Sequence, residues 1–427
     1  MKIVILGLGT AGFAAMLAIK KTNPNAEIVI IDNKDFDLLH NCGMPYVIAG
    51  KIEQMNELEH HLDLEGMGVT KIKANAVSIE EKKIKLDNNE TVDFDKLIIA
   101  TGSKAFIPPV EGSEYVYIMD NVENAKKFKE ACKRIKSIVI VGAGAIGIET
   151  AIALAEKGIK VNVVEMMGRV LANMLDNDMA SLIQNKLEEK GIKFYLSRRV
   201  EKIGKKYVVL EGGKSVKGDL VLMAAGVRPN IEFIKNILID KAVVVNDKME
   251  TNVKDIYAAG DCVQVKNLIS GKPSLAWLAG PAYKQGTVAG VNSAGGNAKY
   301  NGAIGTAVVK MGEVETASTG FNKEFAEKND FEIIAGKMKG TDTAGWYPDA
   351  KELTVKILVD KKTRKIIGGQ AVGSNAANKI NVVAAAIKGE MIIDDFSDLE
   401  LAYCPSVGDA YDILVGAADL CLRKMNR

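Results

Sequence analysis

Two patterns in this chain could carry chemistry: a cysteine in a short polar loop, and two glycine-rich turns. The cysteine is Cys42, within the segment HNCGMPY at His40–Tyr46. A cysteine followed by small residues and a proline is typical of a loop that enters a helix, where the helix dipole lowers the pKa of a thiol. Cys42 could therefore serve as a thiolate nucleophile. Considered alone, the same residue could equally be a buried structural cysteine.

The two glycine-rich turns share the pattern Gly-x-Gly-x-x-Gly. Their glycines are Gly7, Gly9 and Gly12 in the first turn and Gly142, Gly144 and Gly147 in the second. Each turn follows an apolar β-branched stretch, precedes a run of small residues, and is followed after about twenty residues by an acid, Asp32 or Glu165. Such a turn lets backbone amides approach a pyrophosphate, while the acid binds ribose hydroxyls. The repeat therefore predicts two dinucleotide sites.

Three further turns follow apolar stretches. KLIIATG ends at Thr101 and Gly102, DLVLMAAG ends at Gly226, and the run TNVKDIYAAGDC reaches Asp261. A carboxylate directly after an apolar strand is costly unless it has a partner. We expect Asp261 to bind flavin ribityl hydroxyls, or water near the pyrophosphate; the alternative is that it caps the following turn.

These residues need strands and helices to position them. Each glycine turn lies between a predicted strand and a predicted helix, which indicates two Rossmann-like βαβ domains. From about residue 302 the pattern changes to alternating strand segments such as GTAVVKMG and LTVKILVD, with a helix at KINVVAAAIKGEM. The 427-residue chain is therefore expected to be α/β, with a C-terminal α+β domain built on an antiparallel sheet.

The composition and charge of the chain limit the classes of partner that it is expected to bind. The chain has 56 basic and 54 acidic residues and a formal charge of +2, which gives no general electrostatic case for binding nucleic acid or a membrane. Its five cysteines and three histidines lack metal-ligand spacing, so we expect no metal site and no disulfide framework. The apolar run Ile3–Ile19 is interpreted as a buried strand, turn and helix and not as a signal peptide. We expect a soluble, cytoplasmic protein.

Taken together, GLGTAG, NCGMPY, ATGS, GAGAIGIE, AGVRPN and YAAGDC resemble the pyridine nucleotide–disulfide oxidoreductase family, in order and over essentially the whole chain. The resemblance implies a glutathione-reductase-like fold with an FAD domain at 1–110 and 231–301, an NAD(P)H domain at 111–230 and a C-terminal dimerisation domain at 302–427. It implies homodimers with active sites at the subunit interface. FAD would then be held by Gly7, Gly9, Gly12, Asp32, Asn41, Thr101, Gly102 and Asp261, and NAD(P)H by Gly142, Gly144, Gly147, Glu165 and Gly226.

The cysteine loop narrows the resemblance to one branch of the family. Two-cysteine members carry a second cysteine five residues on, where this chain has Val47. The single-cysteine branch comprises coenzyme A-disulfide reductases, NADH oxidases, NADH peroxidases and persulfide reductases. Peroxidases and many oxidases have a histidine where this chain has Thr10, a departure that weighs against peroxide and oxygen as acceptors. His40 could supply a proton near Cys42, or could simply face solvent.

The C-terminal region also resembles that branch. Tyr347 lies in WYP and Tyr403 in LAYCP, two motifs whose tyrosines reach the partner's active site in relatives. The alternative for each tyrosine is packing in the core. Cys404 stands where relatives commonly have alanine. It could fill a small apolar slot on the opposite face of an extended segment from Tyr403, or act as a second redox sulfur supplied by the partner.

The resemblance implies an FAD-dependent NAD(P)H oxidoreductase that reduces a small disulfide, persulfide or polysulfide through Cys42. Coenzyme A derivatives are the first candidates for the substrate. Tyr347 and Tyr403 would assist Cys42. Alternatives are a water-forming NADH oxidase, an electron-transfer flavoprotein of the rubredoxin-reductase type, and a redox sensor. Glu165 favours NADH, although NADPH stays possible, because its carboxylate would repel a 2′-phosphate. The next residues, Met166 and Met167, carry no positive charge that could bind the 2′-phosphate. Arg169 is a nearby cation, but it is a weak candidate for that role.

Overall fold

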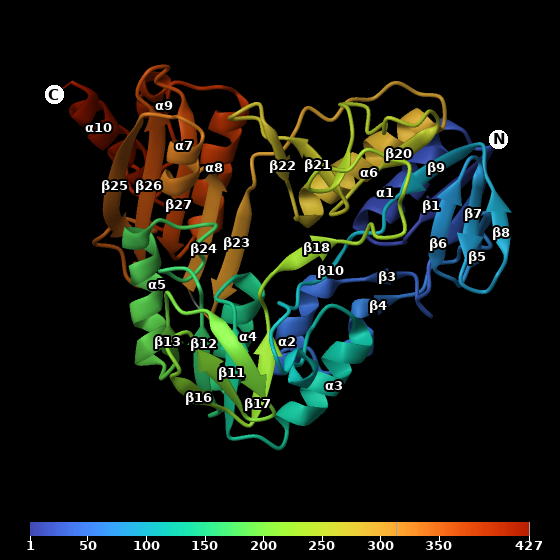
Figure 1. Ribbon diagram of the computed structural model, residues 1–427. Coiled ribbons are helices and arrows are strands. Elements are labelled where there is room, and N and C mark those ends of the chain that lie inside the picture. The colour runs from blue at the N-terminus through green and yellow to red at the C-terminus, as the bar shows by residue number, and fades with distance from the viewer. Residues whose placement is uncertain (313, 427) are drawn as a thin grey trace. The chain divides into compact units, whose positions relative to one another are not determined.

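The computed structural model describes residues 1–312 and 314–426 (Figure 1). Contacts divide the chain into two compact units. The first unit comprises Met1–Met44, Ile52–Phe106 and Val227–Ala303. The second comprises Pro45–Lys51, Ile107–Gly226 and Ile304–Arg427.

The first unit is built on a parallel sheet of five strands in the order β20-β9-β1-β2-β5. Their bounds are Ile256–Ala258 for β20, Lys96–Ile99 for β9, Lys2–Leu6 for β1, Glu27–Ile31 for β2 and Val69–Ile72 for β5. Strand β1 pairs in parallel with both β2 and β9. Its last four residues are buried, as expected for a central strand covered on both faces.

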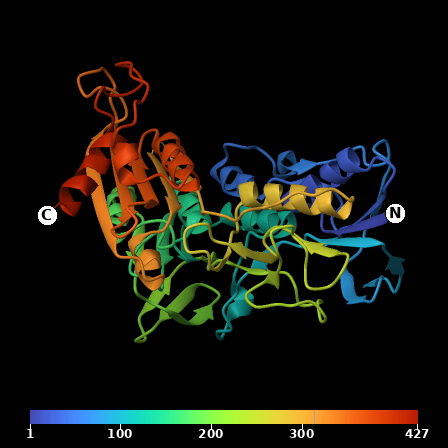
Figure 2. The same cartoon turned by 90° about the horizontal axis from the view of Figure 1, so that it is seen from above.

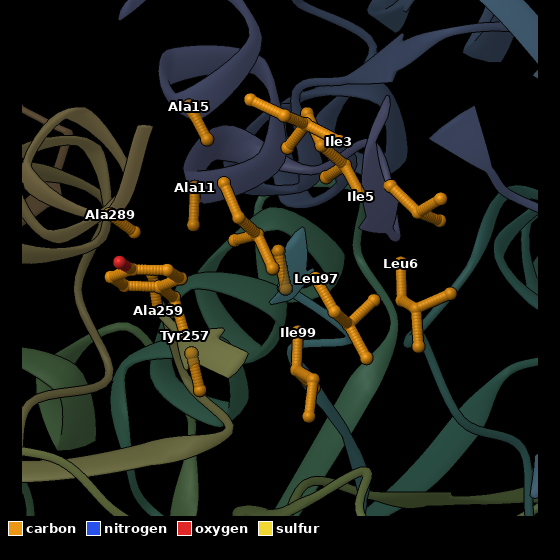
Figure 3. Close-up of a cluster of buried hydrophobic side chains, with 14 of the residues drawn as sticks. Ile3, Ile5, Leu6, Ala11, Ala15, Leu97, Ile99, Tyr257, Ala259 and Ala289 are labelled. Carbon is orange, nitrogen blue, oxygen red and sulfur yellow. The ribbon is translucent and has the colours of Figure 1, made fainter. Parts of the chain in front are cut away.

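Two helices of small residues pack together in this unit, α1 (Thr10–Thr22) and α6 (Ala279–Ser293). A Cβ added to Gly286 would lie 2.1 Å from the carbonyl oxygen of Ala11, and one added to Gly290 would lie 2.4 Å from that of Ala15. The two helix backbones therefore approach closely only because these positions are glycines. Figure 3 shows Ala11, Ala15 and Ala289 near the side chains of β1 and β9 in the buried cluster.

The remaining elements of the first unit are short. Strands β3 (Leu38–Leu39) and β4 (Glu59–His60) pair antiparallel, as do β10 (Ser103–Ala105) and β18 (Val227–Pro229). The other small sheets contain β6 (Ala76–Glu80), β7 (Lys83–Leu86) and β8 (Thr91–Asp93), and β19 (Val243–Val244), β21 (Val263–Lys266) and β22 (Pro273–Leu275). A 3₁₀ turn, η2, spans Met55–Leu58.

The second unit begins with a parallel sheet in the order β13-β12-β11-β17. The strands are β11 (Ser137–Val141), β12 (Lys160–Val164), β13 (Lys193–Tyr195) and β17 (Leu220–Met223), with helices α3 (Val122–Cys132), α4 (Ala145–Ala155) and α5 (Asn177–Glu189). A meander of β14 (Val200–Gly204), β15 (Tyr207–Leu210) and β16 (Ser215–Lys217) follows β13, and η3 spans Ser113–Tyr115. The order of strand, glycine turn, helix and strand repeats that of the first unit.

The C-terminal part of the second unit is an antiparallel sheet in the order β23-β24-β27-β26-β25. Their bounds are Ala307–Met311 for β23, Val314–Gly320 for β24, Ile366–Gly373 for β27, Glu352–Asp360 for β26 and Ile333–Thr341 for β25. Helix α8 (Ala376–Lys388) packs on β27 and β24, and α10 (Ile413–Met425) packs on β25 and β26. Figure 2 shows these red helices against the orange strands. The short helices α7 (Lys323–Lys328) and α9 (Ile393–Ser397) complete it.

The predicted α/β class, with two Rossmann-like sheets and a C-terminal antiparallel sheet backed by helices, is confirmed. Within the described residues, no helix is both long and apolar enough to cross a bilayer. The residue boundaries given for the three domains stay a prediction.

Candidate active site

The first and third glycines of each turn allow close backbone packing. In the first turn, Gly7 has φ +93°, and a Cβ there would lie 2.5 Å from the Ala100 carbonyl oxygen. A Cβ on Gly12 would lie 2.0 Å from the Gly7 carbonyl oxygen. The second turn repeats this geometry, because a Cβ on Gly147 would lie 2.1 Å from the carbonyl oxygen of Gly142, which has φ +111°. Larger residues at these positions would separate helix from strand.

The second glycine of each turn has a different environment. A Cβ added to Gly9 or to Gly144 would meet no atom of the chain within 4 Å. Packing therefore does not require glycine at these two positions. The open space lies at the N-terminal ends of α1 and α4, whose unpaired amides favour an anion. Both turns therefore fit the pyrophosphate of a dinucleotide.

The two acids occupy equivalent positions. Asp32 accepts hydrogen bonds from the backbone nitrogens of Leu8 at 2.6 Å and Lys34 at 2.9 Å. Glu165 accepts them from the corresponding nitrogens of Ala143 and Met167, both at 2.7 Å. Each acid is thus tied to the middle of its own glycine turn, where a ribose would follow the pyrophosphate.

The two acids differ in their charged neighbours. The Lys34 ammonium forms an ion pair with Asp32 at 2.5 Å, and Asp32 is buried. The position equivalent to Lys34 is Met167 in the second turn, so Glu165 has no such cation two residues on. The sequence analysis did not predict Lys34 as a site residue. Its position two residues after Asp32 could have indicated this ion pair.

A third acid, Asp261, is held by a residue that the sequence analysis missed. The Ser103 hydroxyl donates to the Asp261 carboxylate at 2.8 Å, and burial raises the pKa of that carboxyl. No backbone N–H of the following turn bonds this side chain among the described residues, so the alternative as a turn cap is wrong. Nearby, the Thr101 hydroxyl donates to the Asn230 carbonyl at 2.7 Å, and Gly102 has φ +65°.

Cys42 lies in a 3₁₀ turn, η1 (Asn41–Gly43), that runs directly into helix α2 (Met44–Ala49), as predicted. It is exposed, so the alternative of a buried structural cysteine is wrong. The other cysteine of the first unit, Cys262, is fully buried, with its sulfur 3.4 Å from the Ile99 carbonyl oxygen. Burial raises the pKa of Cys262 to about 11. Cys42 is therefore the accessible thiol of this unit.

His40 is exposed and contacts a second histidine. Its ring lies edge-on to that of His60, with centroids 4.6 Å apart, and its backbone nitrogen donates to the Leu58 carbonyl. Asn41 is also exposed. The assignment of Asn41 to FAD stays a prediction.

The two C-terminal tyrosines lie on segments that are bonded to each other. The backbone nitrogen of Ala344 donates to the Pro405 carbonyl at 3.1 Å, and that of Tyr347 donates to the Ala344 carbonyl. Tyr347 is 37% exposed and Tyr403 is 52% exposed. Core packing is therefore excluded for both side chains in the single chain.

Cys404 corrects one expectation. It is exposed, so it does not fill a small apolar slot in the single chain. Its orientation relative to Tyr403 stays a prediction. Its sulfur lies 3.5 Å from the Ser406 hydroxyl, and this hydrogen bond lowers the pKa of the Cys404 thiol.

The structure also corrects the expectation that Arg169 could bind a ribose phosphate. Its guanidinium donates to the carbonyls of Ala172 and Leu175 and pairs with Glu324 at 2.9 Å. Its side chain is only 13% exposed. Arg169 is thus committed to partners within its own unit and does not present a free cation to a ribose phosphate.

Residues 1–286 match the family described as pyridine nucleotide-disulphide oxidoreductase, and residues 306–414 match its dimerisation domain. The chain belongs to this family. Members use FAD and NAD(P)H, which agrees with two dinucleotide turns, and the dimerisation domain supports a homodimer.

Three relatives cover the chain almost completely. An NADH oxidase of Methanocaldococcus jannaschii is 36% identical over 451 aligned positions and covers 100% of both chains. A CoA-dependent NAD(P)H sulfur oxidoreductase of Pyrococcus furiosus is 30% identical and covers 97% of both. The solved structure of an NAD-dependent persulfide reductase from A. fulgidus matches with a TM-score of 0.95 and 33% identity, covering 100% of this chain and 84% of that one. The predicted family is confirmed.

Proposed function

We propose that this chain is an FAD-dependent NAD(P)H oxidoreductase that reduces a small disulfide, persulfide or polysulfide through Cys42. The observation that supports this best is the contrast between the cysteines of the first unit. Cys42 is exposed at the start of a helix, whereas Cys262 is fully buried. A first unit with one exposed thiol suits a substrate that brings its own sulfur–sulfur bond.

Each cofactor has residues that fit it. The first glycine turn with Asp32 and Asp261 would hold FAD, and the second turn with Glu165 would hold NAD(P)H. The space kept open at Gly9 and Gly144, and the acids tied to each turn, support this assignment. When bound, the two cofactors supply the electron pair that reduces a sulfur.

The chain's own residues supply the sulfur chemistry. The Cys42 thiolate attacks one sulfur of the substrate and keeps it as a mixed disulfide or persulfide. The substrate's sulfur–sulfur bond breaks, and its other sulfur leaves as a thiolate or hydrosulfide. Tyr347 and Tyr403 of a second subunit would donate the proton that the leaving sulfur needs. Their exposure in the single chain supports such a role.

A second candidate is an NADH oxidase that reduces oxygen to water with Cys42 as a sulfenate. The Methanocaldococcus jannaschii relative is named for NADH oxidation. Against it stands Thr10, the first residue of α1, at the position where many oxidases have a histidine. The aliphatic hydroxyl of threonine, unlike an imidazole, does not exchange its proton near neutral pH and so cannot replace that histidine as the acid–base partner of a sulfenate.

One anaerobic experiment separates these functions. Oxidation of NADH by the FAD-loaded enzyme is followed with coenzyme A disulfide, polysulfide or hydrogen peroxide as acceptor, and separately with oxygen. We expect the sulfur acceptors to give the largest kcat/KM. Oxygen as the best acceptor, with four-electron reduction to water, would establish the oxidase instead.

Replacing Cys42 tests the role of the sulfur. Cys42→Ser should abolish turnover of sulfur acceptors, while NADH still bleaches the flavin absorbance in a single turnover. Cys262→Ser is the matched control, because that thiol is buried and should leave sulfur reduction nearly intact. Full activity in Cys42→Ser would favour an electron-transfer flavoprotein.

A further inference from the structure

One arginine lies beside the acid of the second turn without being its neighbour in sequence. Strand β13 runs parallel to β12, and the pairing continues past the strand ends. The Glu165 nitrogen donates to the Tyr195 carbonyl, and the Arg198 nitrogen donates to the Glu165 carbonyl, both at 3.0 Å. The Ser197 nitrogen donates to the Met167 carbonyl at 2.9 Å. Residues 197–198 are therefore fixed against the segment that carries Glu165.

The side chain of Arg198 is uncommitted. It is exposed, and among the residues that the structure describes it forms no ion pair and no side-chain hydrogen bond. Arg169 is the contrast: it is closer to Glu165 in sequence, yet its guanidinium is engaged by two carbonyls and Glu324. A guanidinium is the side chain best suited to a phosphate, because its planar donors can bond two oxygens at once.

The charge of Glu165 is already offset in part. Its two oxygens each accept a backbone N–H, from Ala143 and Met167. The loop that follows Glu165 also folds back, since the Leu171 nitrogen donates to the Ala143 carbonyl at 2.9 Å. A phosphate on the ribose would therefore meet a carboxylate held by two amides, and the backbone of Arg198 lies against the segment that carries this carboxylate.

We propose that Arg198 binds the 2′-phosphate of NADPH and so allows this chain to use NADPH as well as NADH. The inference rests on the proposed function only in that the second glycine turn binds a nicotinamide coenzyme. Glu165 then selects the ribose of NADH, and Arg198 accommodates the additional phosphate of NADPH. Coenzyme preference is then set by two residues that follow the ends of adjacent strands, β12 and β13, and not by the loop after Glu165 alone.

Calorimetric titration of the FAD-loaded enzyme with two nucleotide fragments tests this. The probes are adenosine 2′,5′-bisphosphate, which carries the extra phosphate, and 5′-AMP, which lacks it. Arg198→Ala should weaken binding of the bisphosphate about tenfold, as expected for loss of one charge-assisted hydrogen bond, and leave 5′-AMP unchanged. Arg199→Ala is the matched control, because Arg199 has the same charge but its carbonyl pairs with Glu211 in the meander.

Three outcomes would overturn the proposal: unchanged bisphosphate affinity in Arg198→Ala, an equal loss for both probes, or an equal loss in Arg199→Ala. The binding measurement needs no electron acceptor. An enzyme that shows the expected affinities but reduces no sulfur substrate would retain the role of Arg198 and refute the sulfur chemistry. An enzyme that reduces sulfur substrates but lacks the expected affinities would retain the sulfur chemistry and refute the role of Arg198.

Discussion

The carboxylate of Glu165 accepts a hydrogen bond from the backbone nitrogen of Ala143 at 2.7 Å. Asp32 stands in the same relation to Leu8 in the first unit. In both places an acid at the end of one strand is fixed to the glycine turn after the neighbouring strand. The negative charge lies near the N-terminus of a helix, where the dipole favours it.

Glu165 therefore makes a specific prediction about coenzyme preference. Glu165→Arg should lower kcat/KM for NADH by about tenfold, because hydrogen bonds to the ribose are lost. The same change should raise kcat/KM for NADPH, because the 2′-phosphate no longer faces a carboxylate. Steady-state kinetics with both coenzymes measures the shift. A wild-type enzyme that already works better with NADPH would contradict the repulsion argument.

The glycines of the first turn predict two different kinds of failure. Gly12→Ala should destabilise the fold by about 3 kcal/mol or more, because the new Cβ would lie 2.0 Å from the Gly7 carbonyl oxygen. Gly9→Ala should fold normally, because its Cβ meets no protein atom within 4 Å and its φ of −93° suits alanine. It should instead lose FAD. Thermal unfolding and the flavin-to-protein absorbance ratio separate the two effects.

Gly144→Ala provides the control for the second turn. Its Cβ also meets no protein atom within 4 Å. This variant should retain FAD and bind NADH weakly. Loss of FAD in Gly144→Ala but not in Gly9→Ala would reverse the assignment of the two turns.

The repeated fold was predictable because its determinants are local. Each glycine turn lies within a single strand–turn–helix stretch, and the spacing to Asp32 or Glu165 follows from one βαβ unit. The exposed, helix-entering loop at Cys42 was predictable for the same reason. Short-range patterns are sufficient where the elements that position a residue are consecutive in the chain.

Contacts between distant segments were not predictable. Ser103 and Asp261 are 158 residues apart, and Arg169 and Glu324 are 155 apart. The backbone of Arg198 pairs with that of Glu165 only because β13 lies beside β12. No spacing in the sequence predicts these pairs. They depend on the order of strands in a sheet and on packing between segments that are far apart in the chain.

Glu149 predicts a pH dependence of stability. It lies on α4 and lines a cavity of about 30 Å³ with Tyr46, Lys51 and Lys310, and burial raises its pKa from 4.5 to about 7. Between these values the folded state retains a proton that the unfolded state releases. Stability should therefore fall as pH rises from 4.5 to 7, with the full cost of ionising the buried carboxyl present above 7.

Glu149→Gln removes this dependence, because glutamine does not ionise. The variant should match the wild type in Tm near pH 4.5 and exceed it increasingly up to pH 7, with a constant gain above that. Glu156→Gln is the control on the same side of the cavity, since that side chain is exposed and pairs with Lys190. A Tm difference for Glu149→Gln that does not change with pH would show that burial does not govern this carboxyl.

Cys404 makes the last prediction, which concerns polysulfide. A polysulfide leaves Cys42 as a persulfide, and a second thiol can resolve it: the Cys404 thiolate attacks the Cys42 sulfur, hydrosulfide leaves, and a Cys42–Cys404 disulfide forms. The partner subunit's Cys404 would supply that thiol. Its exposure and its lowered pKa, caused by the hydrogen bond with Ser406, suit a nucleophile. Electrons from NADH then regenerate both thiols.

Cys404→Ala should accordingly slow polysulfide turnover in the absence of added thiol and leave reduction of coenzyme A disulfide nearly unchanged. Mild oxidation of the wild type should give a cross-linked dimer on a non-reducing gel, and the variant should not. Cys421→Ala is the matched control, because burial raises the pKa of that thiol to about 12 and makes it inert. Unaltered polysulfide kinetics in Cys404→Ala, together with no cross-link in the wild type, would leave Cys42 as the single working sulfur of the enzyme.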